Sequence, residues 1–560
     1  MSAKRIFSHA HWGNYETSIN EWMDRASKQT LIKRLWQKDP VLWKRDAKAH
    51  KEIVARLGWL TAPKLSKELI ADIGALALQI KEEGIAHVVL LGMGGSSLAP
   101  FVFKSVFGAT EGYPELIVLD STDPAQVTEV ESKIVPEKTI FVVSSKSGGT
   151  IELTSLYKYF SQKLEAVKGV EAGRNFMAIT DPGSPLETLA KERGFRKVFL
   201  APEDVGGRFS ALTVFGLVPA ALSGIDIEKI LQCAERMLER CCAEYEPKDN
   251  EAAYLGIGMA VLSEEGRDKL TILSPDSLAS FGDWAEQLVA ESSGKEGVGI
   301  VPVVREPIAE DISFYGQDRF FVALVPDYAS DKQEFSQKLE ALMQAGHPVL
   351  TLKLKETYDI GGEFFRWEAA TALACALLKI NAFDQPDVQA TKNKTKAILK
   401  QVEAGQAIAI KTTDITPEDF WENVEPGDYA AILAFLPYRD SFNQRLAQLR
   451  QRIRAGAKIA TTLGFGPRYL HSTGQLHKGG ANNAVFILIT APSETDLPIP
   501  GERYGFGQLE LAQAMGDFDA LLASGRWVIH CRMDALTDEA LEQVCARLES
   551  AIPASQAPTA

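Results

Sequence analysis

A polar stretch near residue 144 carries the groups that a phosphate binds. The sequence SSKSGGTIELTS (144–155) directly follows the apolar run TIFVV (139–143). Three hydroxyls, one ammonium and two backbone N–H groups are available there: those of Ser145, Ser147, Thr150, Lys146, Gly148 and Gly149. A following helix would add partial positive charge at its N-terminus. The chain has no G-x-x-x-x-G-K-[ST] pattern, so the stretch favours a monoester such as a sugar phosphate over a triphosphate.

A second glycine-rich turn, LGMGGSSLAP (91–100), follows the apolar run HVVLL (87–91). Taken alone it permits three interpretations: a plain turn, a dinucleotide site or a sugar-phosphate site. Gly92-Met93-Gly94 begins like the G-x-G-x-x-G fingerprint, but Ser97 stands where the third glycine belongs, so the pattern fails. The hydroxyl-rich stretch described above favours the sugar phosphate.

Two charged residues stand at helix ends where the helix dipole disfavours them. Arg208, in DVGGRFSALTVFGL, precedes an apolar helix and therefore needs an anionic partner, either a carboxylate or an anionic intermediate. Glu291, in FGDWAEQLVAESSGKEG, lies near a C-terminal helix end and is a candidate general base. A solvated glutamate remains the alternative. Glu286, five residues earlier, does not share a helix face cleanly with Glu291.

Apolar runs alternate with amphipathic helical segments around these motifs. Three series of such runs are visible: 87–91, 115–120, 139–144, 175–181 and 196–201; then 269–274, 298–304, 319–325 and 348–354; then 429–436, 458–463 and 483–490. Continuous apolar runs separated by helices predict parallel sheets covered on both faces. Ligands in such sheets sit beyond the carboxyl ends of the strands, which places 92–97 and 144–150 at one mouth.

We therefore predict an α/β protein with several domains. The expected divisions are a helical N-terminal extension (1–60), a first three-layer α/β/α domain (61–229), a second one (230–408) and a smaller C-terminal α/β module (425–553). The tail SQAPTA (555–560) is expected to be disordered.

Composition excludes some classes of partner. The net charge of −14 disfavours nucleic acid, although a local basic pocket on an acidic protein can still bind a small anion. The N-terminus has no apolar core of signal-peptide length, and no stretch approaches the uninterrupted apolar length of a membrane span. The six cysteines form no CxxC pair, and no metal-ligand cluster is visible. We expect a cytoplasmic protein with reduced thiols, no membrane partner, no metal and no cofactor.

Five blocks in order resemble the phosphoglucose isomerase (glucose-6-phosphate isomerase) family, which is built from two sugar-isomerase (SIS) domains. The blocks are GMGGSS, SSKSGGTIE, DVGGRFS, QLVAESSGK and INAFDQPDVQATK, and they span about residues 75–400. The GGRFS and ESSGK blocks are specific, whereas the Gly-Ser loops alone are not. The RLWQKD region and the third module resemble the branch that is fused to transaldolase in some bacteria, although we see no transaldolase portion here.

The resemblance implies a role for each matching residue. Arg208 would stabilise an anionic cis-enediol(ate), Glu291 would move a proton between C1 and C2, and Lys392 would help to open the sugar ring. The residues implied in substrate binding are Gly95, Ser96, Ser145, Lys146, Ser147, Thr150, Gln287 and Gln385. Because Pro386-Asp387 and Gln389 depart from the family pattern, Lys394 remains an alternative to Lys392.

The largest departure concerns the family's ring-opening histidine. Asp318 stands at the expected place, and no histidine occurs between His87 and His347. The third module offers a replacement in GPRYLHSTGQLHKGG (466–480), which is similar to the family's own HSFYQLIH segment when a one-residue gap is allowed. We predict His471 as the ring-opening acid/base and His477 as the second choice, because a pKa near neutrality suits this chemistry.

The resemblance thus implies an isomerase of glycolysis and gluconeogenesis that interconverts glucose 6-phosphate and fructose 6-phosphate without a metal. Two alternatives stay open: a dual phosphoglucose/phosphomannose isomerase, and a sugar-phosphate-binding regulator without activity. The protein is expected to be a homodimer or a monomer with a functional link to transaldolase.

Overall fold

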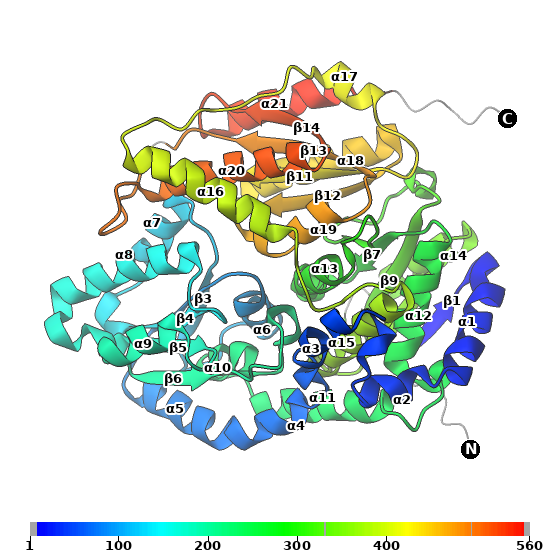
Figure 1. Cartoon of the computed structure of the whole chain (residues 1–560), viewed down its shortest axis with the longest axis horizontal. Coiled ribbons are helices and arrows are strands. Elements are labelled where there is room, and N and C mark those ends of the chain that lie inside the picture. The colour runs from blue at the N-terminus through cyan, green and yellow to red at the C-terminus, as the bar shows by residue number, and fades with distance from the viewer. Residues whose placement is uncertain (1–7, 330–331, 494, 554–560) are drawn as a thin grey trace.

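Three sheets, parallel except for one edge strand, form the framework of the described part of the chain. The computed structural model describes residues 8–329, 332–493 and 495–553, so the predicted disordered tail lies outside the described residues. Figure 1 shows the first sheet at the lower left, the second at the right and the third above both. This arrangement agrees with the predicted α/β fold.

The first sheet contains five parallel strands in the order β3-β2-β4-β5-β6. The strands are β2 (His87–Gly92), β3 (Glu115–Leu119), β4 (Thr139–Ser144), β5 (Phe176–Thr180) and β6 (Lys197–Leu200). All five lie within one or two residues of the predicted runs. The chain moves from β2 outward to β3 and then returns to β4 on the other side of β2, so the strand order reverses between β2 and β4.

The second sheet repeats this reversal between β7 and β9, in the order β1-β10-β9-β7-β8. Its strands are β7 (Lys269–Leu273), β8 (Val301–Val303), β9 (Arg319–Pro326), β10 (Val349–Leu354) and β1 (Ser8–His11). The sequence SHAH predicted no strand, because only helices were expected before residue 60. Antiparallel pairing with β10 makes it one and attaches the N-terminal segment to the second sheet.

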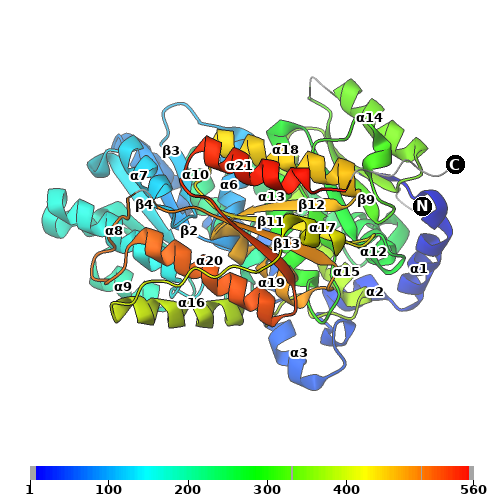
Figure 2. The same ribbon diagram turned by 90° about the horizontal axis from the view of Figure 1, so that it is seen from above.

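The third sheet has the order β12-β11-β13-β14, and its strand order reverses between β11 and β13. Its strands are β11 (Tyr429–Phe435), β12 (Ala460–Phe465), β13 (Ala484–Thr490) and β14 (Trp527–Arg532). β14 is missing from the predicted runs because WVIHCR is interrupted by His530 and ends in Arg532. Figure 2 shows α18 (Asp440–Ala457) and α21 (Asp538–Ser550) on one side of this sheet, with α20 (Phe506–Ala523) on the other.

Helices fill the connections and cover the sheets. Those of the N-terminal segment and the first sheet are α1 (Glu16–Lys28), α2 (Leu31–Trp36), α3 (Ala47–Val54), α4 (Ala62–Ser66), α5 (Ile70–Glu82), α6 (Leu98–Phe107), α7 (Pro124–Lys133), α8 (Ile151–Lys168), α9 (Pro185–Glu192) and α10 (Val214–Leu222). The remaining ones are α11 (Ile227–Arg240), α12 (Glu251–Glu264), α13 (Ala279–Ser293), α14 (Lys332–Gln344), α15 (Ile360–Leu377), α16 (Val388–Glu403), α17 (Pro417–Glu422) and α19 (Gly474–Gly479).

The third module packs against both other sheets. Phe506 and Leu509 of α20 share a hydrophobic core with Phe160 of α8 and with one face of the first sheet. On the opposite side, Ala290 of α13 and Val301 of β8 belong to the core that lies under the third sheet. Burial of these apolar faces fixes the position of the third module relative to the first two.

This packing predicts a large cost for removing the Phe506 ring. Phe506 is fully buried and its ring meets that of Tyr159 edge-on at 5.8 Å between centroids. We expect Phe506→Ala to lower the free energy of unfolding by about 3 kcal/mol or more, measured by urea denaturation followed through fluorescence. Leu522→Ala, at a position 41% exposed on the same helix, should change it by less than about 0.5 kcal/mol. Equal shifts in both variants would contradict this account of the interface.

Candidate active site

Two glycines after β2 let three segments of the chain converge. A Cβ atom on Gly95 would lie 2.2 Å from the carbonyl oxygen of Gly207 and 2.9 Å from the amide nitrogen of Arg208. Gly94 has a φ of 56°, and a Cβ atom there would lie 2.7 Å from the carbonyl oxygen of His471 and 2.8 Å from Nε2 of Gln287. The GMGG turn is therefore the point where the GGRFS block, α13 and the third module meet.

Arg208 is held in place by a buried set of acceptors. Its Nε donates to Ser292 Oγ at 2.8 Å, and its Nη2 donates to the carbonyl oxygens of Ala382 at 2.5 Å and Asp384 at 3.1 Å. Its Nη1 lies 3.5 Å from Oε1 of Glu291. Arg208 thus has the carboxylate partner that its position before a helix demanded, and it faces the predicted base.

Glu291 projects from the last turn of α13 into this cluster. It is 8% exposed, and its Oε2 accepts from Nε2 of Gln287 at 3.2 Å. The same Nε2 donates to the carbonyl oxygen of His471 at 2.7 Å. Gln287 Oε1 is buried and has no hydrogen-bond partner among the described residues. The side chains of Glu291, Gln287 and Arg208 therefore form one polar cluster in which Gln287 Oε1 keeps unused hydrogen-bonding capacity.

Glu286, which also lies on α13, faces a cavity that Glu291 does not line. Glu286 lines a separate cavity of about 600 Å³ together with Asp283, and Glu291 and Gln287 take no part in lining it. Burial, reinforced by the negative charge of Asp283, raises the pKa of Glu286 to about 8. Glu286 is therefore mostly protonated at pH 7 and does not compete with Glu291 as the base.

His471 lies beside the cluster and is paired with a carboxylate that the sequence analysis did not single out. Its Nε2 lies 2.8 Å from Oε1 of Glu152, in the first turn of α8, and the same oxygen accepts from Nε2 of Gln513 at 2.7 Å. Burial alone would raise the pKa of Glu152, but the charge and hydrogen bond of His471 hold it below its usual value. Glu152 is the last residue of SSKSGGTIE, but no pattern in the sequence around it identifies His471, 319 residues away, as its partner.

The predicted phosphate loop follows β4 at the same edge of the first sheet. Ser145 Oγ accepts from the Gly148 amide at 3.1 Å and lies 3.2 Å from Oγ1 of Thr150, while Ser147 is exposed. Ser96 is 8% exposed, and its carbonyl oxygen accepts from Ser144 Oγ at 3.3 Å, which ties the two loops together. The predicted pairing of 92–97 with 144–150 at one mouth is confirmed.

Lys146 of this loop forms an ion pair with Asp181. Its Nζ donates to Oδ1 of Asp181 at 2.8 Å and lies 3.4 Å from the carbonyl oxygen of Pro202. Burial lowers the pKa of this lysine, and Asp181 opposes that shift. The contacts of Lys146 therefore do not support a direct role in holding phosphate unless the ion pair opens.

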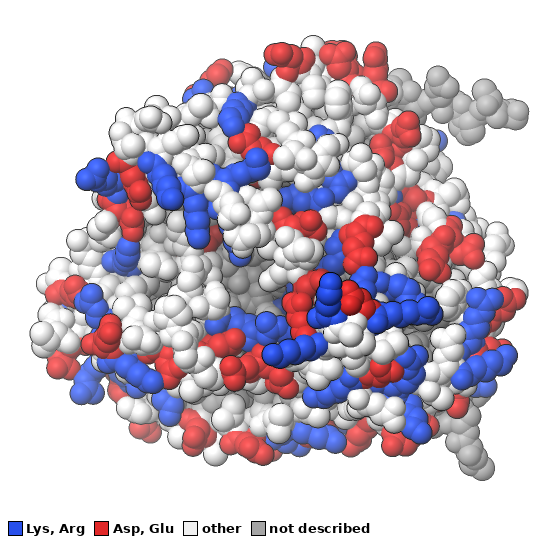
Figure 3. Space-filling view, in the orientation of Figure 1, with Lys and Arg blue, Asp and Glu red and all other residues white. Residues whose placement is uncertain are grey.

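Two predicted residues are exposed and are not drawn into the cluster. Gln385 and Lys392 are both solvent-exposed, and Lys394 is half-buried. Gln385 directly follows Asp384, whose carbonyl oxygen accepts from Arg208, so it borders the site. Lys392 and Lys394 lie on α16, and Figure 3 shows basic side chains over this helix next to a hollow at the centre of the face.

His477 does not join the cluster. It is 2% exposed, and its ring packs between those of Tyr469 and Phe486 at 5.9 and 5.2 Å between centroids. Burial, together with the positive charges of Lys478 and Arg526, lowers its pKa to about 3. A neutral, enclosed imidazole cannot exchange protons with a substrate near neutral pH, so its position does not support the second-choice role.

Asp318 does not replace the missing histidine either. It immediately precedes β9, so it lies at the amino end of that strand, whereas the cluster lies at carboxyl ends. Its Oδ2 is 3.6 Å from Nζ of Lys269 at the start of β7. Asp318 is therefore an ion-pair partner within the second sheet.

Gln475, between the two histidines, is a residue that the sequence analysis missed. It is fully buried, and its Nε2 donates to the Gly294 carbonyl oxygen at 3.0 Å and to Asp387 Oδ2 at 2.5 Å. Its Oε1 accepts from the Asp387 amide at 2.9 Å. One amide side chain thus joins the ESSGK block, the FDQPD block and the third module.

One group among the described residues has the spacing of metal ligands, and it lies outside this cluster. It consists of Cys233, Glu356 and Asp359. The guanidinium of Arg236 contacts all three, at 2.9, 3.3 and 3.2 Å, and so occupies the place of a cation. Burial raises the pKa of the Cys233 thiol to about 12, which disfavours the thiolate that a metal requires.

Solved structures share this fold. A hypothetical protein from Thermus thermophilus superposes with a TM-score of 0.58 at 25% identity, covering 70% of this chain and 99% of that one. A glucose-6-phosphate isomerase from Chlamydia trachomatis superposes with a TM-score of 0.57 at 20% identity, covering 69% and 86% of the two chains. The class is thus an α/β protein with the sheet architecture of a sugar-phosphate isomerase.

Sequence comparison gives the family. The phosphoglucose isomerase family model matches residues 69–314, which end before the third sheet. A glucose-6-phosphate isomerase from Carboxydothermus hydrogenoformans is 32% identical over 405 residues, covering 62% of this chain and 86% of the relative. One from Mycoplasmopsis pulmonis is 29% identical, covering 62% of this chain and 90% of the relative. The chain belongs to the phosphoglucose isomerase family.

The contact of Gly95 with the GGRFS block predicts a sensitive position. In Gly95→Ala, the new methyl group would overlap the Gly207 carbonyl oxygen, so the loop carrying Arg208 has to shift. We expect kcat/KM to fall roughly 10²-fold, the scale of an ångström-sized misplacement, when fructose 6-phosphate conversion is measured. Gly74→Ala on α5 is the control, since nothing lies within 4 Å of its added Cβ. Unchanged kcat/KM in Gly95→Ala would contradict the contact.

Proposed function

We propose that the chain interconverts glucose 6-phosphate and fructose 6-phosphate through a cis-enediol(ate), with Glu291 as the base. The observation that carries this proposal is the buried arrangement of Glu291 and Arg208, 3.5 Å apart, with Gln287 beside them. A carboxylate base next to a fixed guanidinium is what transfer of a proton α to a carbonyl requires. The family to which the chain belongs supports the same reaction.

The proposed steps balance without a cofactor. After ring opening, Glu291 removes the proton from C2 of the aldose, and the electron pair moves to make the C1–C2 double bond and an enediolate oxygen. Arg208 offsets the negative charge that develops on that oxygen. Glu291 then returns the proton to C1, and the proton of the O2 hydroxyl passes to O1 as the C2 carbonyl forms, which gives the ketose. The hydroxyls and amides of the 145–150 loop would bind the phosphate at the N-terminus of α8.

Ring opening is assigned to His471, oriented by Glu152. A carboxylate oxygen 2.8 Å from Nε2 fixes the orientation of the His471 ring, and histidine is the side chain most often used as a general acid/base. Lys392, exposed on α16, remains the predicted partner in this step. His471 belongs to the same chain as Glu291, so we infer that one chain suffices for catalysis and that a homodimer is not required for it.

Two alternatives lead to different outcomes in the same assay. A dual phosphoglucose/phosphomannose isomerase would also convert mannose 6-phosphate. A regulator without activity would bind sugar phosphate but would not turn it over, and the presence of both Glu291 and Arg208 in one cluster argues against it. A functional link to a separate transaldolase stays part of the proposal. Among the described residues, no helix has the length and apolar character needed to cross a membrane.

Glu286 and Glu291, both on α13, supply a matched test of the base. Glu291→Gln should lower kcat for fructose 6-phosphate by roughly 10²- to 10⁴-fold, because it removes the proton acceptor. Glu286→Gln should stay within about twofold, since Glu286 with a pKa of about 8 is mostly protonated at pH 7 and the amide resembles that form. The assay measures glucose 6-phosphate formation, with and without a chelator and with mannose 6-phosphate as a second substrate. Full turnover by a folded Glu291→Gln variant would contradict the proposed role of Glu291 as the base.

A double-mutant cycle tests the histidine. His471→Ala should reduce turnover by roughly 10²-fold, the lower scale for loss of a general acid/base, and Glu152→Gln should reduce it less. If Glu152 acts only through His471, the double variant is no slower than His471→Ala alone, since residues that act as a unit are not additive. Additive losses would instead show that Glu152 has a role independent of His471. Wild-type turnover in His471→Ala would show that another residue opens the ring.

A further inference from the structure

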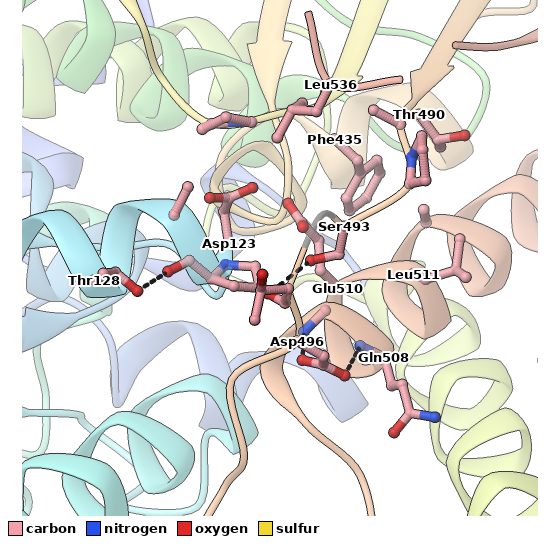
Figure 4. A pocket seen from close by; sticks show the side chains of 18 of the residues that line it. Asp123, Thr128, Phe435, Thr490, Ser493, Asp496, Gln508, Glu510, Leu511 and Leu536 are labelled. Carbon is pink, nitrogen blue, oxygen red and sulfur yellow. Dashed lines mark hydrogen bonds between the residues drawn. The ribbon is translucent and has the colours of Figure 1, made fainter. Parts of the chain in front are cut away.

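A cavity of about 550 Å³ lies at the carboxyl edge of the third sheet (Figure 4). Its walls come from the ends of β11, β13 and β14, from the first turns of α20, and from α7 of the first domain. None of the active-site residues described above lines it. It is thus a separate space between the first domain and the third module.

The cavity occupies the position where the topology of an open α/β sheet favours a ligand. Phe435 at the end of β11 and Thr490 at the end of β13 both line it, and the strand order reverses between these two strands. In such sheets, ligands bind outside the carboxyl ends at the reversal point. In the first sheet the same point, between β2 and β4, holds the loops 92–97 and 144–150 of the active site.

Two buried carboxyl groups line the cavity. Glu510 is 8% exposed, and its Oε1 has no hydrogen-bond partner within the described part of the chain. Asp123 is 4% exposed and caps α7 through the Gln126 amide at 3.0 Å. Burial raises the pKa of both carboxyl groups, and the negative charge of Asp123 and a hydrogen bond between the two side chains raise the pKa of Glu510 further, while Glu510 Oε1 stays without a partner. A buried polar atom left without a partner is costly, so a ligand hydroxyl at Glu510 would be favourable.

Two arginines contribute positive charge to the lining of the same cavity. Arg439 and Arg532 both line the cavity and are exposed, and neither forms an ion pair with a described residue. Arg439 stacks on the Phe442 ring at 5.3 Å, which leaves its donors free. Guanidinium groups recognise phosphate through paired N–H donors. The lining therefore combines hydroxyl-binding carboxyl groups with cations suited to a phosphate.

We propose that this cavity is a second ligand site that binds a small phosphorylated polyol, with the phosphate at Arg439 and Arg532 and the hydroxyl groups at Asp123 and Glu510. The cavity volume suits a small ligand, since ligand pockets range upward from about 300 Å³. The site is distinct from the catalytic centre, and the proposal does not depend on turnover.

A chain of hydrogen bonds connects this site to His471. Thr122, next to Asp123, donates from Oγ1 to Gln513 Oε1 at 3.1 Å, and Gln513 donates to Glu152, which holds His471. Gln513 lies three residues after Glu510 on α20, so the two share a helix face. A ligand that moves α7 relative to α20 would change the hydrogen bond that orients the histidine. Occupancy of the second site is therefore expected to alter kcat.

Sorbitol 6-phosphate is a suitable probe because it has no carbonyl group and cannot be isomerised. Calorimetric titration of the full chain should give two molecules bound per chain, and the double variant Arg439→Ala/Arg532→Ala should bind one. Arg452→Ala, an exposed arginine of α18 outside the cavity lining, is the control and should retain two. Glu510→Gln should weaken the second site several-fold without removing the first.

The inhibition pattern tests the link to catalysis. Sorbitol 6-phosphate should lower kcat and raise KM in the wild type, but only raise KM in the double arginine variant. One molecule per chain in the wild type would overturn the site, and purely competitive inhibition in the wild type would overturn the coupling. Equal affinity of the second site for inorganic phosphate and for sorbitol 6-phosphate would overturn the polyol assignment.

Discussion

The enclosure of α13 by all three sheets is the constraint on which the rest of the structure depends. Leu288 and Val289 belong to the core shared by the first two sheets, and Ala290 belongs to the core under the third. A helix apolar on several faces is stable only inside a protein. Its few polar side chains must then find partners there, and Gln287 and Glu291 do so by meeting His471 and Arg208.

Burial also sets the electrostatics of the cluster. Arg208 and Glu291 are 5% and 8% exposed, so water screens their interaction little. Fixed acceptors around the guanidinium, which are Ser292 Oγ and the carbonyl oxygens of Ala382 and Asp384, prevent it from collapsing onto the carboxylate. A guanidinium held in this way can respond to charge that develops on a substrate without first reorganising, and this is the basis of electrostatic preorganisation.

The third module completes the cluster from within the same chain. Gln475 and the carbonyl oxygen of His471 bind directly to the ESSGK block and to Gln287. Glu152 then links the first sheet to the same histidine. The first and third sheets share a reversal of strand order at which loops gather, and this geometry explains why a cavity lined by charged residues forms at the third sheet as well.

The sequence by itself determined the strands, the class of fold and the two central residues of the cluster. Buried parallel strands are continuous apolar runs, so the local sequence pattern locates them. The strands SHAH and WVIHCR were not predicted because their residues do not form such a run. Arg208 and Glu291 stood out because each is at a helix end that disfavours its charge. The resemblance to a family supplied their roles, and no local pattern could have done so.

Only the tertiary structure decided the different surroundings of His471 and His477, which are six residues apart in the sequence. Packing encloses His477 between two aromatic rings and places His471 beside Glu152. It also pairs Lys146 with Asp181 and Asp318 with Lys269. The physical reason is that propensity and periodicity act over a few residues, whereas the partners of His471, Lys146 and Asp318 are tens to hundreds of residues away and meet them only when the sheets pack.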